Sequence, residues 1–265
     1  MARTTGNNAV VSAASIAAAV ALFAFATEPG AMDVSRDAPI ETAAPAAAQT
    51  AAPSPGTDPT SLLRAKIAAA WADTTRVWAQ LIGQDAIDAY TPQIAFVAKV
   101  QATHCYGLYI SAGPVYCSAN NTVFVSLDEM LRLEHKLPGF GDEGLTLLVA
   151  HEFGHHVQKL SGRFRLLSSM MHENPGAERD LVRRFELEAD CLAGFWAGHS
   201  HAELAGPVQR QALLRAAEAI GDDRTAAVDA AEFTHGSAAQ RRRWFEAGMA
   251  ANVLEDCDVL HAASY

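Results

Sequence analysis

The sequence contains no long run of lysine or arginine and no basic stripe. Its 265 residues include 20 Lys and Arg against 30 Asp and Glu, so the formal net charge is −10. Nucleic-acid binding depends on clustered cations that neutralise phosphates, and this composition therefore argues against a nucleic-acid partner. The one dense basic cluster, Arg241-Arg242-Arg243, is interpreted as a solvated helix face.

The sequence also lacks a Cys-x-x-Cys pair, which argues against a zinc ribbon and against a thioredoxin-like redox site. Its four cysteines are Cys105, Cys117, Cys191 and Cys257. The first two are close enough in sequence to close a hairpin or a short loop, and by elimination Cys191 could then pair with Cys257. Two disulfides would fit an oxidising compartment. The alternative is that Cys191 is a buried thiol on a helix.

No charged residue interrupts residues 9–26, an alanine-rich apolar run that follows Arg3 and ends in Ala24-Phe25-Ala26. A cationic start, an apolar middle and an Ala-x-Ala end are typical of a secretory signal peptide. The run is also just long enough to span a bilayer. We therefore expect residues 1–27 to be a signal peptide or a membrane anchor. The rest of the chain is then extracytoplasmic, either secreted or tethered to the cytoplasmic membrane.

Large apolar residues are scarce between residues 28 and 60, where Ala, Pro, Thr and Ser dominate. Such a segment cannot bury enough apolar surface to offset the entropy lost on ordering, so we interpret it as a flexible linker or stalk. No internal repeat is visible. The remaining residues, 61–265, are expected to form one folded domain.

The spacing of apolar residues within this domain predicts a helix over Ser61–Ile82. Short apolar runs predict three strands, at Gln93–Val97, Pro114–Cys117 and Thr122–Ser126. Ser126 and the acids after it are typical of a helix start, and the chain after Gly141 has a helical pattern throughout. Because the strands precede most of the helices, the fold class should be α+β, with a small antiparallel sheet followed by a mostly helical half.

The segment Gly144 to Ser161 contains no proline and places His151 and His155 four residues apart. On a helix this spacing puts both imidazoles on one face, one turn apart, as two ligands of a tetrahedral zinc require. Glu152 lies one step round the helix, where it could take a proton from a zinc-activated water attacking a peptide carbonyl. The alternative is an amphipathic helix with histidines on its polar face. A third histidine six residues after His155 would mark a metzincin, but that position is Ser161.

A catalytic zinc normally needs a third protein ligand and an open fourth position. A second helical segment offers Glu186 and Asp190, which are four residues apart and share a face. One of them can bind the metal while the other accepts a hydrogen bond from a ligating imidazole. Glu188 lies on another face and is the weaker candidate. The alternative for Glu186 is an ordinary surface acid beside two arginines.

Two of the longer motifs read His-Glu-Phe-Gly-His-His-Val-Gln at His151–Gln158 and Glu-Leu-Glu-Ala-Asp-Cys-Leu-Ala-Gly at Glu186–Gly194. A shorter motif precedes them at Gly113–Cys117, and others follow at Gly221–Arg224, Thr234–Ser237, Gln240–Arg241 and Trp244–Phe245. Together, over about residues 61–265, they resemble the bacterial family of predicted neutral zinc metallopeptidases. This chain departs from the family pattern where Glu188 replaces a common glutamine, Val115 a phenylalanine and Ser126 a frequent aspartate.

The resemblance implies a thermolysin-like (gluzincin) site in which three residues bind a single zinc ion, namely His151, His155 and Glu186. It further implies that Glu152 is the general base and that Asp190 orients one histidine ligand, which we take to be His151. His235 becomes a candidate for stabilising the oxyanion, with a helix-capping or packing histidine as the alternative. His156 should point away from the metal and play a structural part.

These features lead us to expect a zinc-dependent endopeptidase acting on a peptide or protein substrate, bound as an extended strand along the sheet edge at Thr122–Ser126. One alternative is a non-catalytic envelope protein stabilised by a closed zinc site, with a fourth ligand from His172, His199 or His235. Another is a zinc hydrolase acting on cell-wall peptide amides. Glu152 favours an enzyme, because a structural site needs no base. The residues do not indicate an oligomeric state.

Overall fold

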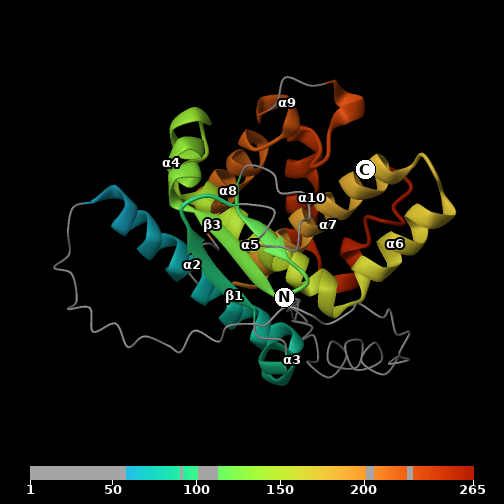
Figure 1. Cartoon of the computed structure of the whole chain (residues 1–265), viewed down its shortest axis with the longest axis horizontal. Helices are drawn as coiled ribbons and strands as arrows, with labels where there is room; N and C mark the ends of the chain where they lie inside the picture. Colours follow the sequence, from blue (N-terminus) through green and yellow to red (C-terminus); the bar gives the residue numbers. More distant parts are fainter. Residues whose placement is uncertain (1–57, 90–91, 101–112, 201–205, 226–228) are drawn as a thin grey trace, which may run out of the picture.

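The computed structural model describes residues 58–89, 92–100, 113–200, 206–225 and 229–265 (Figure 1). The expected leader at residues 1–27 and the linker as far as residue 57 lie outside these ranges. The described α-helices are α2 (Pro59–Ile82), α3 (Gln84–Ala89), α4 (Leu127–Lys136), α5 (Gly141–Leu160), α6 (Arg163–Glu173), α7 (Glu178–His199), α8 (Pro207–Ala219), α9 (Asp222–Thr225) and α10 (Ala238–Ala250). Short 3-10 helices are η3 (Ala230–Glu232) and η4 (Leu254–Cys257), and the strands are β1 (Gln93–Val97), β2 (Val115–Cys117) and β3 (Thr122–Ser126).

A small sheet followed by a mostly helical half confirms the expected α+β class (Figure 1). Among the described helices, none combines the length and the apolar character needed to cross a bilayer. The candidate anchor at residues 9–26 lies outside the part searched.

The sheet differs from the expectation in two respects. Its strand order is β1-β3-β2, so Thr122–Ser126 is the central strand and the expected substrate edge along it is wrong. It is also mixed rather than antiparallel, because β1 runs parallel to β3 while β2 runs antiparallel to it. A parallel pair needs a long connection. In the sequence β2 lies between the two parallel strands, and in the sheet it pairs with β3 on the side away from β1. The two edges are therefore β1 and β2.

Local capping explains where several helices begin. Asp58 accepts a hydrogen bond from the Ser61 backbone N–H, and Pro59 occupies the first turn of α2, where a missing N–H costs nothing. This helix therefore begins two residues before the expected Ser61. Ser126 caps α4 through the Glu129 N–H, as expected from the acids that follow it.

The helix α5 is the centre of the fold, in contact with α2, α7, α8 and β2 (Figure 1). Phe153 on α5 is fully buried, and its ring lies 5.3 Å from that of Trp71 and 6.3 Å from that of Trp78. Buried aromatic rings supply a large apolar area each, so this cluster fixes α5 against α2. The opposite side of the helix faces α7.

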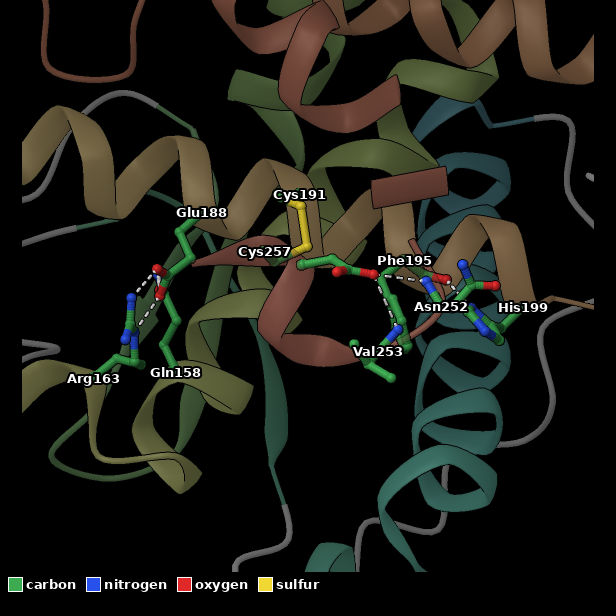
Figure 2. Close-up of a disulfide and its surroundings, with 10 residues drawn as sticks. Gln158, Arg163, Glu188, Cys191, Phe195, His199, Asn252, Val253 and Cys257 are labelled. Atoms are coloured by element: carbon green, nitrogen blue, oxygen red, sulfur yellow. Dashed lines mark hydrogen bonds and ion pairs between the residues drawn. A yellow bond between two sulfur atoms is a disulfide. The ribbon is translucent and has the colours of Figure 1, made fainter. Parts of the chain in front are cut away.

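A disulfide between Cys191 and Cys257 joins the middle of α7 to η4 (Figure 2). This pair agrees with the pairing expected by elimination, and the alternative of a buried thiol at Cys191 is wrong. Cys117 is fully buried on β2 and is not a free thiol. Its expected partner, Cys105, lies outside the described residues.

Candidate metal centre

The site forms where α5 and α7 cross, and one glycine sets how closely they approach. A Cβ on Gly154 would lie 2.9 Å from the backbone oxygen of Ala189, closer than real Cβ contacts allow. Only glycine therefore lets the two helices meet at this depth. The close approach brings the Glu186–Asp190 turn of α7 against the His151–His155 turn of α5.

Three side chains predicted as metal ligands converge at this crossing. His151 Nε2 lies 3.2 Å and His155 Nε2 lies 3.3 Å from the same oxygen, Glu186 Oε2. Donor atoms of the three residues all lie within 4.8 Å of one another. Ligands at about 2.1 Å from a tetrahedral zinc are separated by about 3.4 Å, so the two distances from the histidines to Glu186 suit this ion. The alternative of a surface acid at Glu186 is wrong.

The other nitrogen of each histidine faces a hydrogen-bond acceptor. His151 Nδ1 donates to Asp190 Oδ1 over 2.8 Å, as expected, and His155 Nδ1 lies 2.7 Å from Gln158 Oε1. A proton held at Nδ1 leaves Nε2 as the metal-binding nitrogen. Two imidazole nitrogens and a carboxylate oxygen form a typical zinc donor set, so the residues present fit the expected ion.

Arg241 is a component of the site that the sequence did not reveal. We expected it on a solvated face, but its side chain is buried and only 3% of the residue is exposed. The guanidinium binds both oxygens of Asp190, at 2.9 and 2.7 Å, and it also donates to the Ile220 carbonyl. A buried carboxylate is costly without such a partner, and this bidentate pair keeps Asp190 ionised behind His151.

Charge pairs within the cluster raise the pKa of a histidine and lower the pKa of a carboxyl group. Burial alone would lower the pKa of His151, but the hydrogen bond and charge of Asp190 raise that pKa to about 10. Burial likewise opposes the charged form of Glu186, yet the charges of His155 and His235 hold the pKa of this carboxyl well below its usual range. Glu186 is therefore an anion at neutral pH, as a metal ligand must be.

Glu152 lies beside the ligands without joining them. It is buried, and its Oε2 accepts the backbone N–H of Tyr116 over 2.6 Å. Burial raises the pKa of Glu152, and the charges of His155 and His151 only partly offset this. A raised pKa makes the carboxylate a stronger base near neutrality. Since Tyr116 is on the edge strand β2, Glu152 contacts that strand while it follows the proposed ligand His151 on α5.

His156 points away from the ligands, as expected. Its side chain is fully buried, and its Nδ1 lies 3.0 Å from the hydroxyl of Tyr116. Burial lowers the pKa of His156 to about 4, so it is neutral at physiological pH. Its contact with Tyr116 connects α5 to β2.

His235 lies at the rim of the cluster, with its Nε2 3.8 Å from Glu186 Oε2 and its side chain 30% exposed. The loop that carries it is held by Asp222 Oδ2, which accepts the backbone N–H groups of Thr234, His235 and Gly236. The motifs at Gly221–Arg224 and Thr234–Ser237 therefore meet in space. The helix cap that follows belongs to Ser237, so the capping alternative for His235 is wrong.

Two site residues, Gln158 and Arg241, belong to motifs in the sequence, although the sequence does not show what they contact. Gln158 ends the motif that begins at His151, and a helix places it one turn beyond His155. Arg241 belongs to the Gln240-Arg241 motif. Both motifs are visible in the sequence, but Asp190, which pairs with Arg241, and Glu188, which accepts from Gln158, lie on another helix, α7.

The comparisons with known proteins agree with this geometry. A family model described as "Putative neutral zinc metallopeptidase" matches residues 4–260. The chain is similar to Uncharacterized protein YpfJ of Escherichia coli K12, with 34% identity over 196 residues, covering 71% of this chain and 68% of that protein. It is also similar to Uncharacterized protein Rv2575 of Mycobacterium tuberculosis H37Rv, with 32% identity over 229 residues, covering 78% and 74%.

No solved structure matches this chain. The family match extends over almost the whole sequence, and it includes every residue of the ligand cluster. This protein therefore belongs to the neutral zinc metallopeptidase family.

Proposed function

We propose that this protein is a zinc-dependent endopeptidase that hydrolyses peptide bonds with Glu152 as general base. The observation that carries the proposal is the convergence of His151 Nε2, His155 Nε2 and Glu186 Oε2. Zinc bound by these atoms would act as a Lewis acid. It would lower the pKa of a bound water molecule to near neutrality and polarise the substrate carbonyl.

Glu152 is placed to move the proton. Its Oε2 is held by the Tyr116 N–H, which leaves Oε1 to take a proton from the attacking water and later pass it to the leaving amine. The raised pKa of Glu152 supports this exchange, since a more basic carboxylate accepts the proton more readily. His235, at the rim beside Glu186, is our candidate donor to the developing oxyanion.

We place the substrate along β2 rather than β3. Of the two sheet edges, β2 is the one that packs on α5, and its Tyr116 contacts the proposed base directly. An extended peptide added beside β2 would present its carbonyl to the ligand cluster. Val115, where the family commonly has phenylalanine, would then help to set the side-chain preference.

The rival proposal of a closed structural zinc site has less support. It needs a fourth protein ligand, yet within the described ranges the candidate metal group contains three residues only. None of the three expected candidates, His172, His199 and His235, belongs to this group. His235 lies at its rim, with Nε2 3.8 Å from Glu186 Oε2, and His199 Nδ1 donates to the Phe195 carbonyl. Three ligands leave a position open for water and substrate, which is the arrangement of catalytic zinc sites.

We also propose that the folded domain works outside the cytoplasm. The Cys191–Cys257 disulfide supports this location, because disulfides persist in oxidising compartments. Cell fractionation would test it, and recovery of the protein in the cytoplasm with both cysteines reduced would contradict it.

The central test compares the full-length protein with Glu152→Gln and His155→Ala. Zinc content and peptide cleavage are measured for each, with and without a chelator. We expect wild type to bind one zinc ion and to lose cleavage on chelation. Glu152→Gln should keep the zinc but lose about 10²–10⁴-fold in kcat, whereas His155→Ala should lose the zinc itself. If Glu152→Gln cleaved the peptide at the wild-type rate, the mechanism would be ruled out.

A further inference from the structure

Behind His155 lies a buried polar side chain that the catalytic scheme leaves without a role. Gln158 is 0% exposed, and its Oε1 lies 2.7 Å from His155 Nδ1. Its Nε2 donates to the Phe185 carbonyl over 2.8 Å and to Glu188 Oε1 over 3.1 Å. Both ends of the amide are therefore engaged, although the whole group is removed from solvent.

These contacts allow one orientation of the amide. A carbonyl and a carboxylate only accept hydrogen bonds, so the side of Gln158 that faces Phe185 and Glu188 must be its NH2 group. The side that faces His155 must then be the oxygen. An oxygen there can accept only from an N–H, which places the ring proton of His155 on Nδ1. His155 Nε2 is left to face Glu186 as a metal-binding nitrogen.

The carboxylate that holds the amide is itself held from outside. Arg163 donates to Glu188 through Nε, at 2.8 Å, and through Nη2, as Figure 2 shows beside Gln158. The same guanidinium also pairs with Asp258, the residue after the disulfide cysteine Cys257. A two-point Arg contact fixes both the charge and the plane of a carboxylate. Glu188 is therefore kept as an acceptor for Gln158.

The arrangement parallels the one behind the other histidine ligand. There, Arg241 holds Asp190, and Asp190 accepts the Nδ1 proton of His151. On the His155 side an amide lies between the carboxylate and the histidine. Arg163 contacts Glu188, Glu188 contacts Gln158, and Gln158 contacts His155. An amide has two chemically different ends, and the orientation on this side consequently depends on the outer pair.

We propose that Gln158 is a positioning residue that fixes the tautomer of His155 for zinc binding, and that Glu188 and Arg163 hold its amide the right way round. This inference rests on the proposed zinc function. It assigns to Glu188, which the sequence marked only as a weak ligand candidate, a function in metal affinity without contact to the metal.

The test measures the zinc Kd by chelator competition and the visible absorption spectrum of the Co²⁺-substituted full-length protein. Gln158→Met keeps the length of the side chain but removes the acceptor, and we expect its zinc Kd to rise roughly 10–100-fold. Glu188→Met should raise the Kd by about tenfold, because the amide is then free to turn. Glu188→Gln retains an acceptor oxygen and is the residue common in the family, so its Kd should stay within about threefold of wild type.

Thr74→Val is the matched control. Thr74 is also fully buried and hydrogen-bonded, to the Ala70 carbonyl, but it lies on α2, which contributes no residue to the ligand cluster. Thr74→Val should leave the zinc Kd and the Co²⁺ spectrum unchanged, whatever its effect on the melting temperature of the metal-free protein. If Gln158 were merely structural, Gln158→Met would show this same pattern.

Each outcome has a distinct meaning. Unchanged zinc Kd and Co²⁺ spectrum in Gln158→Met and Glu188→Met, with zinc bound by wild type, would overturn the positioning role and leave the peptidase proposal intact. Should Gln158→Met fail to fold, the Glu188→Met and Glu188→Gln pair decides the matter. Zinc binding by wild type without any peptide cleavage would overturn the proposed activity alone, and absence of zinc binding would overturn both.

Discussion

At the scale of single residues, Asp222 shows how one carboxylate positions a whole loop. Its Oδ2 accepts three consecutive backbone N–H groups, from Thr234, His235 and Gly236. Burial opposes its ionisation, but the hydrogen bonds with His235 and the backbone hold the pKa of Asp222 below its usual range. The position of His235 at the rim of the metal site therefore depends on an ionised Asp222.

Asp222→Asn should destabilise the protein by about 1 kcal/mol at neutral pH, because hydrogen bonds to a charged carboxylate are stronger than those to an amide oxygen. For a domain of this size the melting temperature should fall by roughly 2–4 °C. Since the folded pKa is depressed, the stabilisation is present above the unfolded pKa and is lost as pH falls through the folded value. The difference in melting temperature between the two proteins should therefore shrink as the pH falls below about 4. A constant difference would contradict the assignment.

At the scale of elements, the crossing of α5 and α7 decides whether ligands from two helices meet. Gly154 sits where the helices touch, against the backbone of Ala189. A second close approach, of α7 to α10, occurs at Gly198, where a Cβ would lie 2.5 Å from the Met249 oxygen. The first crossing sets the distance from the histidines to Glu186, whereas the second lies far along α7 from the site.

Gly154→Ala should push α7 away from α5, and we expect the zinc Kd to rise at least tenfold. Overpacking should also cost about 1–3 kcal/mol of stability. Gly198→Ala provides the matched control, because it overpacks α7 at its other end and should lower stability with little change in zinc affinity. Chelator competition and thermal melting measure the two quantities separately. Equal zinc affinity in both variants would show that the crossing distance does not limit the site.

At the scale of the whole molecule, the Cys191–Cys257 disulfide ties the C-terminal segment to α7 next to the site. Cys191 follows Asp190 directly, and Cys257 precedes Asp258, the outer partner of Arg163. The bond closes a loop with a sequence separation of 66 residues. Loops of this length lose about 4 kcal/mol of unfolded-state entropy when they are cross-linked.

Replacement of both cysteines, Cys191→Ala with Cys257→Ala, should therefore destabilise the protein by about 4 kcal/mol. We expect the melting temperature to fall by roughly 8–15 °C. Adding reductant should lower the melting temperature of the variant less than that of wild type, because the variant already lacks this disulfide. Equal melting temperatures for the variant and the oxidised wild type would show that the disulfide contributes no stability.

The sequence alone determined the features that depend on short spacing. Helical geometry places residues four apart on one face, so His151 and His155, and likewise Glu186 and Asp190, could be paired from the sequence. The strand Thr122–Ser126 and the Ser126 cap of α4 followed from local patterns in the same way. The expected ligand set came from the resemblance of these motifs to a known family.

Only the tertiary structure decided which surfaces meet. It made Thr122–Ser126 a central strand, buried Arg241 against Asp190, and turned Glu188 toward Gln158 and Arg163. Each of these contacts joins elements far apart in the sequence. Their partners are selected by packing and by the need to pair every buried charge, and these constraints exist only after the chain has folded.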